Sequence, residues 1–91
     1  MVVEKVYFIQ AASGLVKIGR STDVPRRKKA LQLAHGERLK LLGAIPGGAV
    51  LERQFHDRWS HLRQTGEWFS PAPELLGAID QALAAPQLDL V

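Results

Sequence analysis

Cysteine is absent from the 91 residues, which excludes a disulfide framework, a thiolate metal site and a cysteine nucleophile. Apolar runs are short, and none approaches the length of a membrane-spanning helix. The first ten residues include Glu4 where a secretory signal has a basic segment. We therefore expect an intracellular, cytoplasmic protein with no membrane partner.

Several common catalytic motifs are also missing. The sequence contains no HExxH pair, no glycine-rich phosphate loop and no serine in a nucleophile elbow. What is present is an ordinary globular composition, with 46% apolar and 23% charged residues. A chain of this length forms one small core, so we expect one domain over residues 1–85 and a short tail over residues 86–91.

Positive charge is concentrated in the first half of the chain. Residues 1–42 contain nine basic and three acidic side chains, whereas the remainder contains three basic and six acidic ones. A basic region favours a phosphate-bearing partner, because clustered Lys and Arg release condensed counterions on contact. A solvated basic surface is the alternative interpretation.

The beginning of the chain has the pattern of a β-hairpin. β-Branched and aromatic residues predict strands from Val2 to Gln10 and from Leu15 to Gly19. A three-residue loop that ends at Gly14 suits the connection, since glycine readily adopts the positive φ that such a loop requires. In that register Tyr7 and Lys17 lie diagonally on one face of the hairpin.

Three helices and one further strand are expected after the hairpin. The residues Ser21, Thr22 and Asp23 are candidate helix caps, and Gly66 to Phe69 forms an irregular or short extended piece. The predicted elements are a helix from about Val24 to Ala34, a strand from Leu39 to Ile45, a helix from about Ala49 to Leu62, and a last helix that the segment Ser70 to Glu74 opens and that runs to about Ala85.

The first of these helices has an unusual inner face. Its apolar stripe is interrupted by Arg27 or Lys28, at a position where a helix that packs on a core normally carries an apolar side chain. Either an anion lies beside this face, or the aliphatic stems pack on the sheet and the charges point to water.

The later part of the chain contributes two further candidate groups. Glu52 and His56 are one helical turn apart, so they form either a divalent-cation site or an ordinary hydrogen-bonded pair. Trp68 and Phe69 form either a hydrophobic clamp across the sheet or, if Trp68 is exposed, a stacking surface for a base.

Taken in order, four segments resemble the GIY-YIG nuclease superfamily. They are KVYFIQ, VKIGRSTDVPRR, LERQFHDRW and TGEWF, and they span residues 5–69. The resemblance is closest to a divergent branch with a KIG second motif, known from phage-type proteins and from a family named for a meiotically up-regulated gene. It implies an α+β fold with a β-β-α-β-α core, in which helices flank a small three-stranded antiparallel sheet, followed here by a C-terminal helix.

The resemblance also implies metal-dependent cleavage of a phosphodiester. Glu52 matches the metal-binding glutamate and would hold Mg²⁺ or Mn²⁺, while Arg27 would stabilise the charge of the transition state. Tyr7, with a pKa lowered by Lys17 or by the metal, would take a proton from the attacking water. His56 would carry a proton or orient Glu52.

Two positions depart from the pattern of the superfamily. Lys17 replaces the tyrosine of the second motif, and Leu31 replaces a histidine that nuclease members often carry. No separate recognition module is evident, so we expect low sequence specificity, or specificity supplied by a protein partner or an oligomer. Four residues are candidate contacts to nucleic acid, DNA in the first place: Arg20, Arg26, Lys28 and Lys29.

The sequence is therefore compatible with three functions. The first is a metal-dependent nuclease. The second is a noncatalytic nucleic-acid-binding module on the same fold, which the basic first half and the two replaced residues favour. The third is a small interaction domain that docks a protein partner through Trp68 and Phe69.

Overall fold

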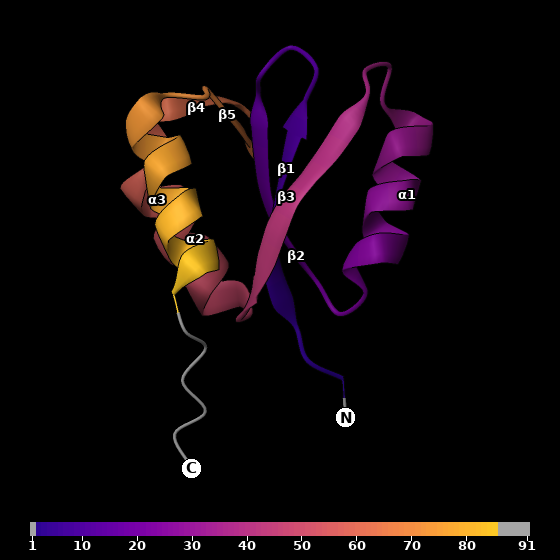
Figure 1. The fold of residues 1–91 in the computed structure, drawn as a ribbon, viewed down its shortest axis with the longest axis horizontal. Helices are drawn as coiled ribbons and strands as arrows, with labels where there is room; N and C mark the ends of the chain where they lie inside the picture. The colour runs from indigo at the N-terminus through magenta and orange to yellow at the C-terminus, as the bar shows by residue number, and fades with distance from the viewer. Residues whose placement is uncertain (1, 86–91) are drawn as a thin grey trace.

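The central strand of the molecule is buried on both of its faces. Residues 6–9 of this strand are consecutive and all buried. Because successive side chains of a strand point to opposite faces, such a run requires cover on both sides of the sheet. The computed structural model describes residues 2–85 and shows this cover, with one helix against one face and two helices against the other (Figure 1). The helices are α1 (Val24–Ala34), α2 (Ala49–Arg58) and α3 (Pro73–Ala84).

The sheet has five strands, and its order is β3-β1-β2-β5-β4, with every neighbouring pair antiparallel. The α+β class is confirmed, but the expected three-stranded sheet is wrong because two short strands extend it beyond β2. One of them has three residues, all exposed, and the other has only two, so neither shows an alternating pattern. The strands are β1 (Lys5–Ala11), β2 (Val16–Ser21), β3 (Leu39–Pro46), β4 (Arg63–Thr65) and β5 (Trp68–Phe69).

The N-terminal hairpin forms in the predicted register. Ile9 pairs with Lys17 and Tyr7 pairs with Gly19, so Tyr7 and Lys17 lie on the same face of the sheet. Gly14 has a φ of 104°, which is the left-handed conformation expected at the end of the loop.

Two predicted boundaries differ from the structure by three or more residues. β1 begins at Lys5 rather than Val2, since Lys5 is opposite the last residue of β3 and the preceding residues have no partner strand among residues 2–85. The second helix ends at Arg58 rather than Leu62. Trp59 leaves the helical conformation, and a short 3-10 turn (Ser60–Leu62) follows, which keeps the Trp59 side chain in the core.

The two faces of the sheet bury separate apolar clusters. The larger cluster lies under α2 and α3, and the smaller one lies under α1 and includes Tyr7. Trp68 belongs to the α1 side and Phe69 to the other, as the clamp interpretation of these two residues requires. The tail expected over residues 86–91 lies outside the described residues. No helix within residues 2–85 combines the length and the apolar character needed to cross a membrane.

Candidate active site

The candidate site forms where one edge of β2 lacks a neighbouring strand. β5 pairs with Val16 and Lys17 alone, so among the strands of residues 2–85 nothing pairs with this side of β2 from Gly19 to Ser21. We call this segment, Gly19 to Ser21, the β2 edge. Because no strand covers it, side chains from both faces of the sheet can meet there.

Tyr7 approaches the β2 edge from the α1 side of the sheet. Its ring lies over Gly19, its partner in the neighbouring strand. A Cβ atom at position 19 would be 2.5 Å from Oη of Tyr7 and 2.6 Å from Cζ, which is closer than any side-chain contact permits. The absence of a side chain at Gly19 therefore lets the phenol cross β2, although Tyr7 itself is only 2% exposed.

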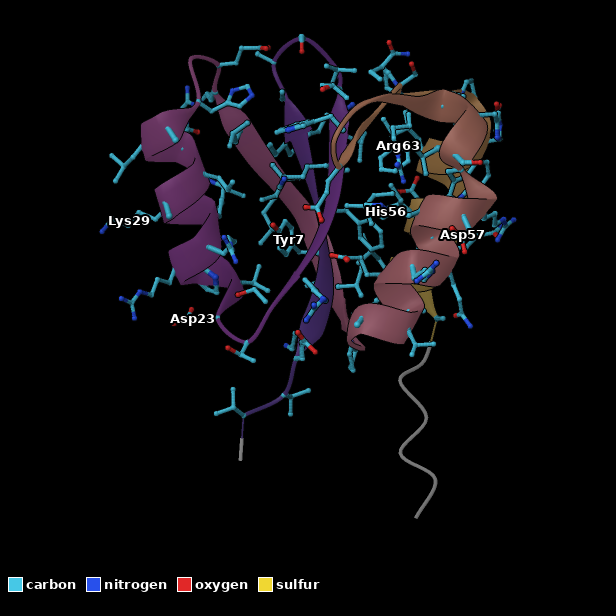
Figure 2. All side chains as sticks on the ribbon, turned by 180° about the vertical axis from the view of Figure 1, so that it is seen from behind. Tyr7, Asp23, Lys29, His56, Asp57 and Arg63 are labelled. Carbon is cyan, nitrogen blue, oxygen red and sulfur yellow. The ribbon has the colours of Figure 1, made fainter. Side chains whose placement is uncertain are left out.

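Helix α2 supplies Glu52 and His56 from the opposite side of the sheet. Nε2 of His56 is 2.8 Å from the carbonyl oxygen of Ile18, and this hydrogen bond ties α2 to β2. The His56 ring also packs edge-on against Phe69, with ring centroids 5.0 Å apart. Glu52 lies one helical turn before His56 on the same side of α2. Figure 2 shows Tyr7 and His56 on either side of the central strands.

Arg27 enters the site from the first turn of α1. Asp23 caps the helix, since its side chain accepts a hydrogen bond from the backbone N–H of Arg26 at 3.2 Å. This cap fixes the start of the helix and therefore places Arg27 in its first turn. Tyr7, Lys17, Arg27 and Glu52 all line one hollow of about 450 Å³. His56 lines a neighbouring hollow of about 500 Å³, which Glu52 also borders.

The charged side chains that line the first hollow balance one another. Three cationic and three anionic side chains line it. Lys17 Nζ is 3.1 Å from an oxygen of Glu67, and Arg20 lies between Glu4, at 2.6 Å, and Glu52, at 3.8 Å. The pairing with Glu4 raises the pKa of Arg20 above its ordinary value.

Glu67 is the residue of the site that sequence reasoning missed. One ligand atom from each of Glu52, His56 and Glu67 lies within 4.8 Å of the other two, and no other group of this kind was found within residues 2–85. The aromatic residues dominate the pattern of Gly66 to Phe69, and the one acidic side chain of this segment, between the glycine and Trp68, is the signal in the sequence that points to Glu67.

The four candidate nucleic-acid contacts occupy different environments. Arg26 and Lys29 are exposed on α1, and Arg26 borders a third hollow of about 310 Å³ together with Arg27. Lys28 is half-buried. Arg20 is engaged with carboxylates inside the first hollow, so its charge is already partly offset within the protein.

The protein's own groups raise the pKa of Tyr7 to about 12. Burial of the phenol is the largest cause, the negative charges of Glu67 and Glu52 add to it, and the positive charge of Arg27 opposes it. The expectation that Lys17 lowers this pKa is wrong, because the ammonium group of Lys17 is paired with Glu67.

Titration of the phenol tests this environment, because Tyr7 is the only tyrosine in the chain. Its pKa in the folded protein is higher than the ordinary value of about 10. The resulting stabilisation is complete below pH of about 10 and is lost as the pH rises through about 12. We expect the near-ultraviolet absorbance of tyrosinate to appear near pH 12 in the folded protein. If the tyrosinate absorbance appeared near pH of about 10 while the protein was still folded, the burial of Tyr7 beside two carboxylates would be contradicted.

The fold and the hollow define a small α+β domain in which a phenol, a guanidinium group and carboxylates meet at an open strand edge. The family model for the T5orf172 domain matches residues 4–85, which include every helix and strand described here. The chain belongs to the T5orf172 domain family, whose domain is phage-associated and lies in the neighbourhood of the GIY-YIG and HNH-like endonucleases. No curated protein and no solved structure matches the chain.

Proposed function

We propose that the protein is a metal-dependent nuclease that cleaves phosphodiester bonds of nucleic acid, DNA in the first place, as a member of the KIG branch of the GIY-YIG superfamily. The observation that carries this proposal is the meeting of Tyr7, Arg27 and Glu52 in one hollow. These residues come from three separate elements and from both faces of the sheet.

The environment of Glu52 fits a divalent cation. Its side chain is only 18% exposed, and Arg20, the cation paired with it, is 3.8 Å away. A largely desolvated carboxylate with so distant a partner is costly unless another cation approaches it. Mg²⁺ or Mn²⁺ prefers such oxygen ligands, and when bound it would polarise a phosphoryl oxygen and stabilise the leaving oxygen.

Arg27 and Tyr7 supply the remaining chemistry. Within residues 2–85 Arg27 forms no ion pair with a carboxylate, so its guanidinium group is available to bind a phosphate and stabilise the added charge of the transition state. Tyr7 Oη holds its proton at neutral pH and orients the attacking water through its lone pairs. A cation beside Glu52 and Glu67 would offset their part in the raised pKa of Tyr7, whereas burial, its largest cause, would remain, so orienting the water is the role that this environment favours for the phenol.

The balance of charge in the hollow favours the nuclease over the noncatalytic module. With three cationic and three anionic side chains, the hollow alone attracts a phosphodiester weakly. A divalent cation beside Glu52 makes the site positive, so binding of nucleic acid there depends on the metal. The noncatalytic module, by contrast, requires no metal.

The direct test is incubation of the purified protein with supercoiled, branched and single-stranded DNA and with RNA. We expect strand cleavage in Mg²⁺ or Mn²⁺ and none in EDTA, with little dependence on sequence. A partner protein or a second copy of the chain would supply specificity in the cell. Binding of nucleic acid that is unchanged by EDTA, with no cleavage of any substrate, would instead establish the noncatalytic module.

The exposed basic residues of α1 are expected to contact phosphates outside the hollow. Replacing both Arg26 and Lys29 with Ala should weaken binding of DNA uniformly, because contacts to phosphates carry no sequence information. The slope of log K against log salt should fall by about 2, since each phosphate contact contributes about 0.9. Fluorescence anisotropy at several salt concentrations measures this slope. Lys40→Ala, on the exposed part of β3, is the control; equal slopes for the double variant and this control would refute the contact.

A further inference from the structure

The backbone of β2 positions the carboxylate of Glu67. Glu67 lies in the turn between β4 and β5, and its carbonyl oxygen accepts a hydrogen bond from the N–H of Ile18 at 3.1 Å. Its carboxylate then has two possible partners. Lys17 Nζ is 3.1 Å away on one side, and Glu52 and His56 are on the other.

The imidazole of His56 is oriented as a nitrogen ligand. Because the carbonyl of Ile18 can only accept a hydrogen bond, Nε2 of His56 carries the hydrogen. Nδ1 therefore keeps its lone pair, which accepts a hydrogen bond from Arg63 at 3.3 Å, so an ion binds Nδ1 only in place of the Arg63 guanidinium group. Histidines that bind metals commonly donate their other ring N–H to a backbone carbonyl in this way.

The spacing of the three groups suits a single ion. One ligand atom from each of Glu52, His56 and Glu67 lies within 4.8 Å of the other two. Ligands on opposite sides of an octahedral ion with bonds of about 2.1 Å are about 4.2 Å apart. Only one pair of the three can be opposite, and adjacent ligands are about 3.0 Å apart, so side-chain movements of about 1 Å are needed to close the site.

We propose that Glu52, His56 and Glu67 form a cation site with one imidazole and two carboxylates, which prefers Mn²⁺ to Mg²⁺, and that Glu67 leaves Lys17 to join it. The proposal deepens the proposed function and rests on it for the role of the ion in cleavage. The nitrogen ligand sets the preference, because imidazole suits transition metals, whereas Mg²⁺ retains water and prefers oxygen.

When the Glu67 carboxylate leaves Lys17 for the ion, the charge that a substrate meets in the first hollow changes. The Lys17 side chain is only 14% exposed, and its ammonium group is 5.5 Å from the centroid of the Trp68 ring. When Glu67 turns to the ion, Lys17 remains in the hollow without that carboxylate, next to Tyr7 and Arg27. Binding of the cation thus converts a neutral ion pair into a cation that faces the phosphate.

Titration with Mn²⁺ in the absence of nucleic acid tests the ligand set. The paramagnetic resonance signal of the aqueous ion reports how much Mn²⁺ stays free. We expect one Mn²⁺ per chain and a loss of affinity of at least about tenfold in Glu52→Gln and in Glu67→Gln. His56→Gln should lower the affinity for Mn²⁺ more than that for competing Mg²⁺. Glu74→Gln, an exposed carboxylate on α3, should bind as the unaltered protein does.

The exchange itself is tested with Lys17→Met, which keeps the length of the side chain and removes its charge. Without its competitor, Glu67 should bind the ion more tightly, so we expect a severalfold gain in affinity. The same substitution made in Glu67→Gln should have no effect, because the two residues act as a pair. Circular dichroism of each variant verifies that it is folded.

Two results would overturn the site. The first is that folded Glu67→Gln binds Mn²⁺ as tightly as the unaltered protein does. The second is that Lys17→Met changes the affinity for Mn²⁺ by the same factor whether or not Glu67 is replaced with Gln. Failure of the nuclease proposal is distinguishable from either. If Mn²⁺ binds with the expected losses but no substrate is cleaved, the cation site holds and the nuclease function is wrong.

Discussion

Glu52→Gln is expected to reduce cleavage at least about a thousandfold while leaving the protein folded. The cation that Glu52 holds contributes several kcal/mol to stabilisation of the transition state, and each 1.4 kcal/mol corresponds to a factor of ten in rate. The amide keeps the size of the side chain but lacks the charge that binds the ion. Because Arg20 pairs with this largely desolvated charge only at 3.8 Å, its removal should not lower the melting temperature.

Asp57→Asn is the matched control for Glu52→Gln. Asp57 is on the same helix, but its side chain is 74% exposed and points away from the sheet, where it pairs with Arg53 (Figure 2). Its loss removes one negative charge from α2 without touching the first hollow, although Asp57 borders the neighbouring hollow of His56. The rate of plasmid nicking should therefore fall with Glu52→Gln alone. Equal rates for the two variants would mean that the charge of α2, and not the site, determines activity.

Gly19→Ala is expected to reduce cleavage at least about a hundredfold, although glycine takes no part in the chemistry. The added methyl group would lie 2.5 Å from Oη of Tyr7, so the phenol must leave its position over β2. Displacing a group that orients the attacking water is costly even over about 1 Å. Overpacking should also lower the free energy of unfolding by about 1–3 kcal/mol.

Two comparisons separate the loss of positioning from the loss of stability. Gly36→Ala adds the same methyl group where no atom lies within 4 Å, so it should retain full activity. Tyr7→Phe removes only the hydroxyl, and combining it with Gly19→Ala should lower the rate no further, because both act through one phenol. Single-turnover cleavage rates at a temperature where all variants are folded provide the measurement. Full activity in folded Gly19→Ala would contradict the role of the phenol.

The sequence and its resemblance to a family were sufficient to predict that Tyr7, Lys17, Arg27 and Glu52 meet at the hollow, because local rules fix much of their placement. The three-residue loop sets the register of the hairpin and therefore the common face of Tyr7 and Lys17. The Asp23 cap sets the start of α1, which brings Arg27 to its first turn. The resemblance to a nuclease family then connected Glu52 to them.

What the sequence did not predict depends on contacts between distant segments. β5 has only two residues, too few for a pattern, yet its shortness leaves the β2 edge open. Glu67 enters the site because β5 pairs with β2, a pairing that no local signal specifies. The high pKa of Tyr7 follows from burial and from the nearby negative charges of Glu67 and Glu52, which are properties of the folded chain.

The central claim is that Tyr7, Arg27 and Glu52 act together at the β2 edge, where Glu52 binds a cation, Arg27 binds a phosphate and Tyr7 orients the attacking water. A crystal structure of Tyr7→Phe with Mn²⁺ and a short DNA duplex tests it most directly, because anomalous scattering locates the ion. We predict an anomalous peak at the carboxylate of Glu52, with a backbone phosphate between this peak and the guanidinium group of Arg27. Mn²⁺ bound away from Glu52, or DNA bound only at the outer face of α1, would contradict the account.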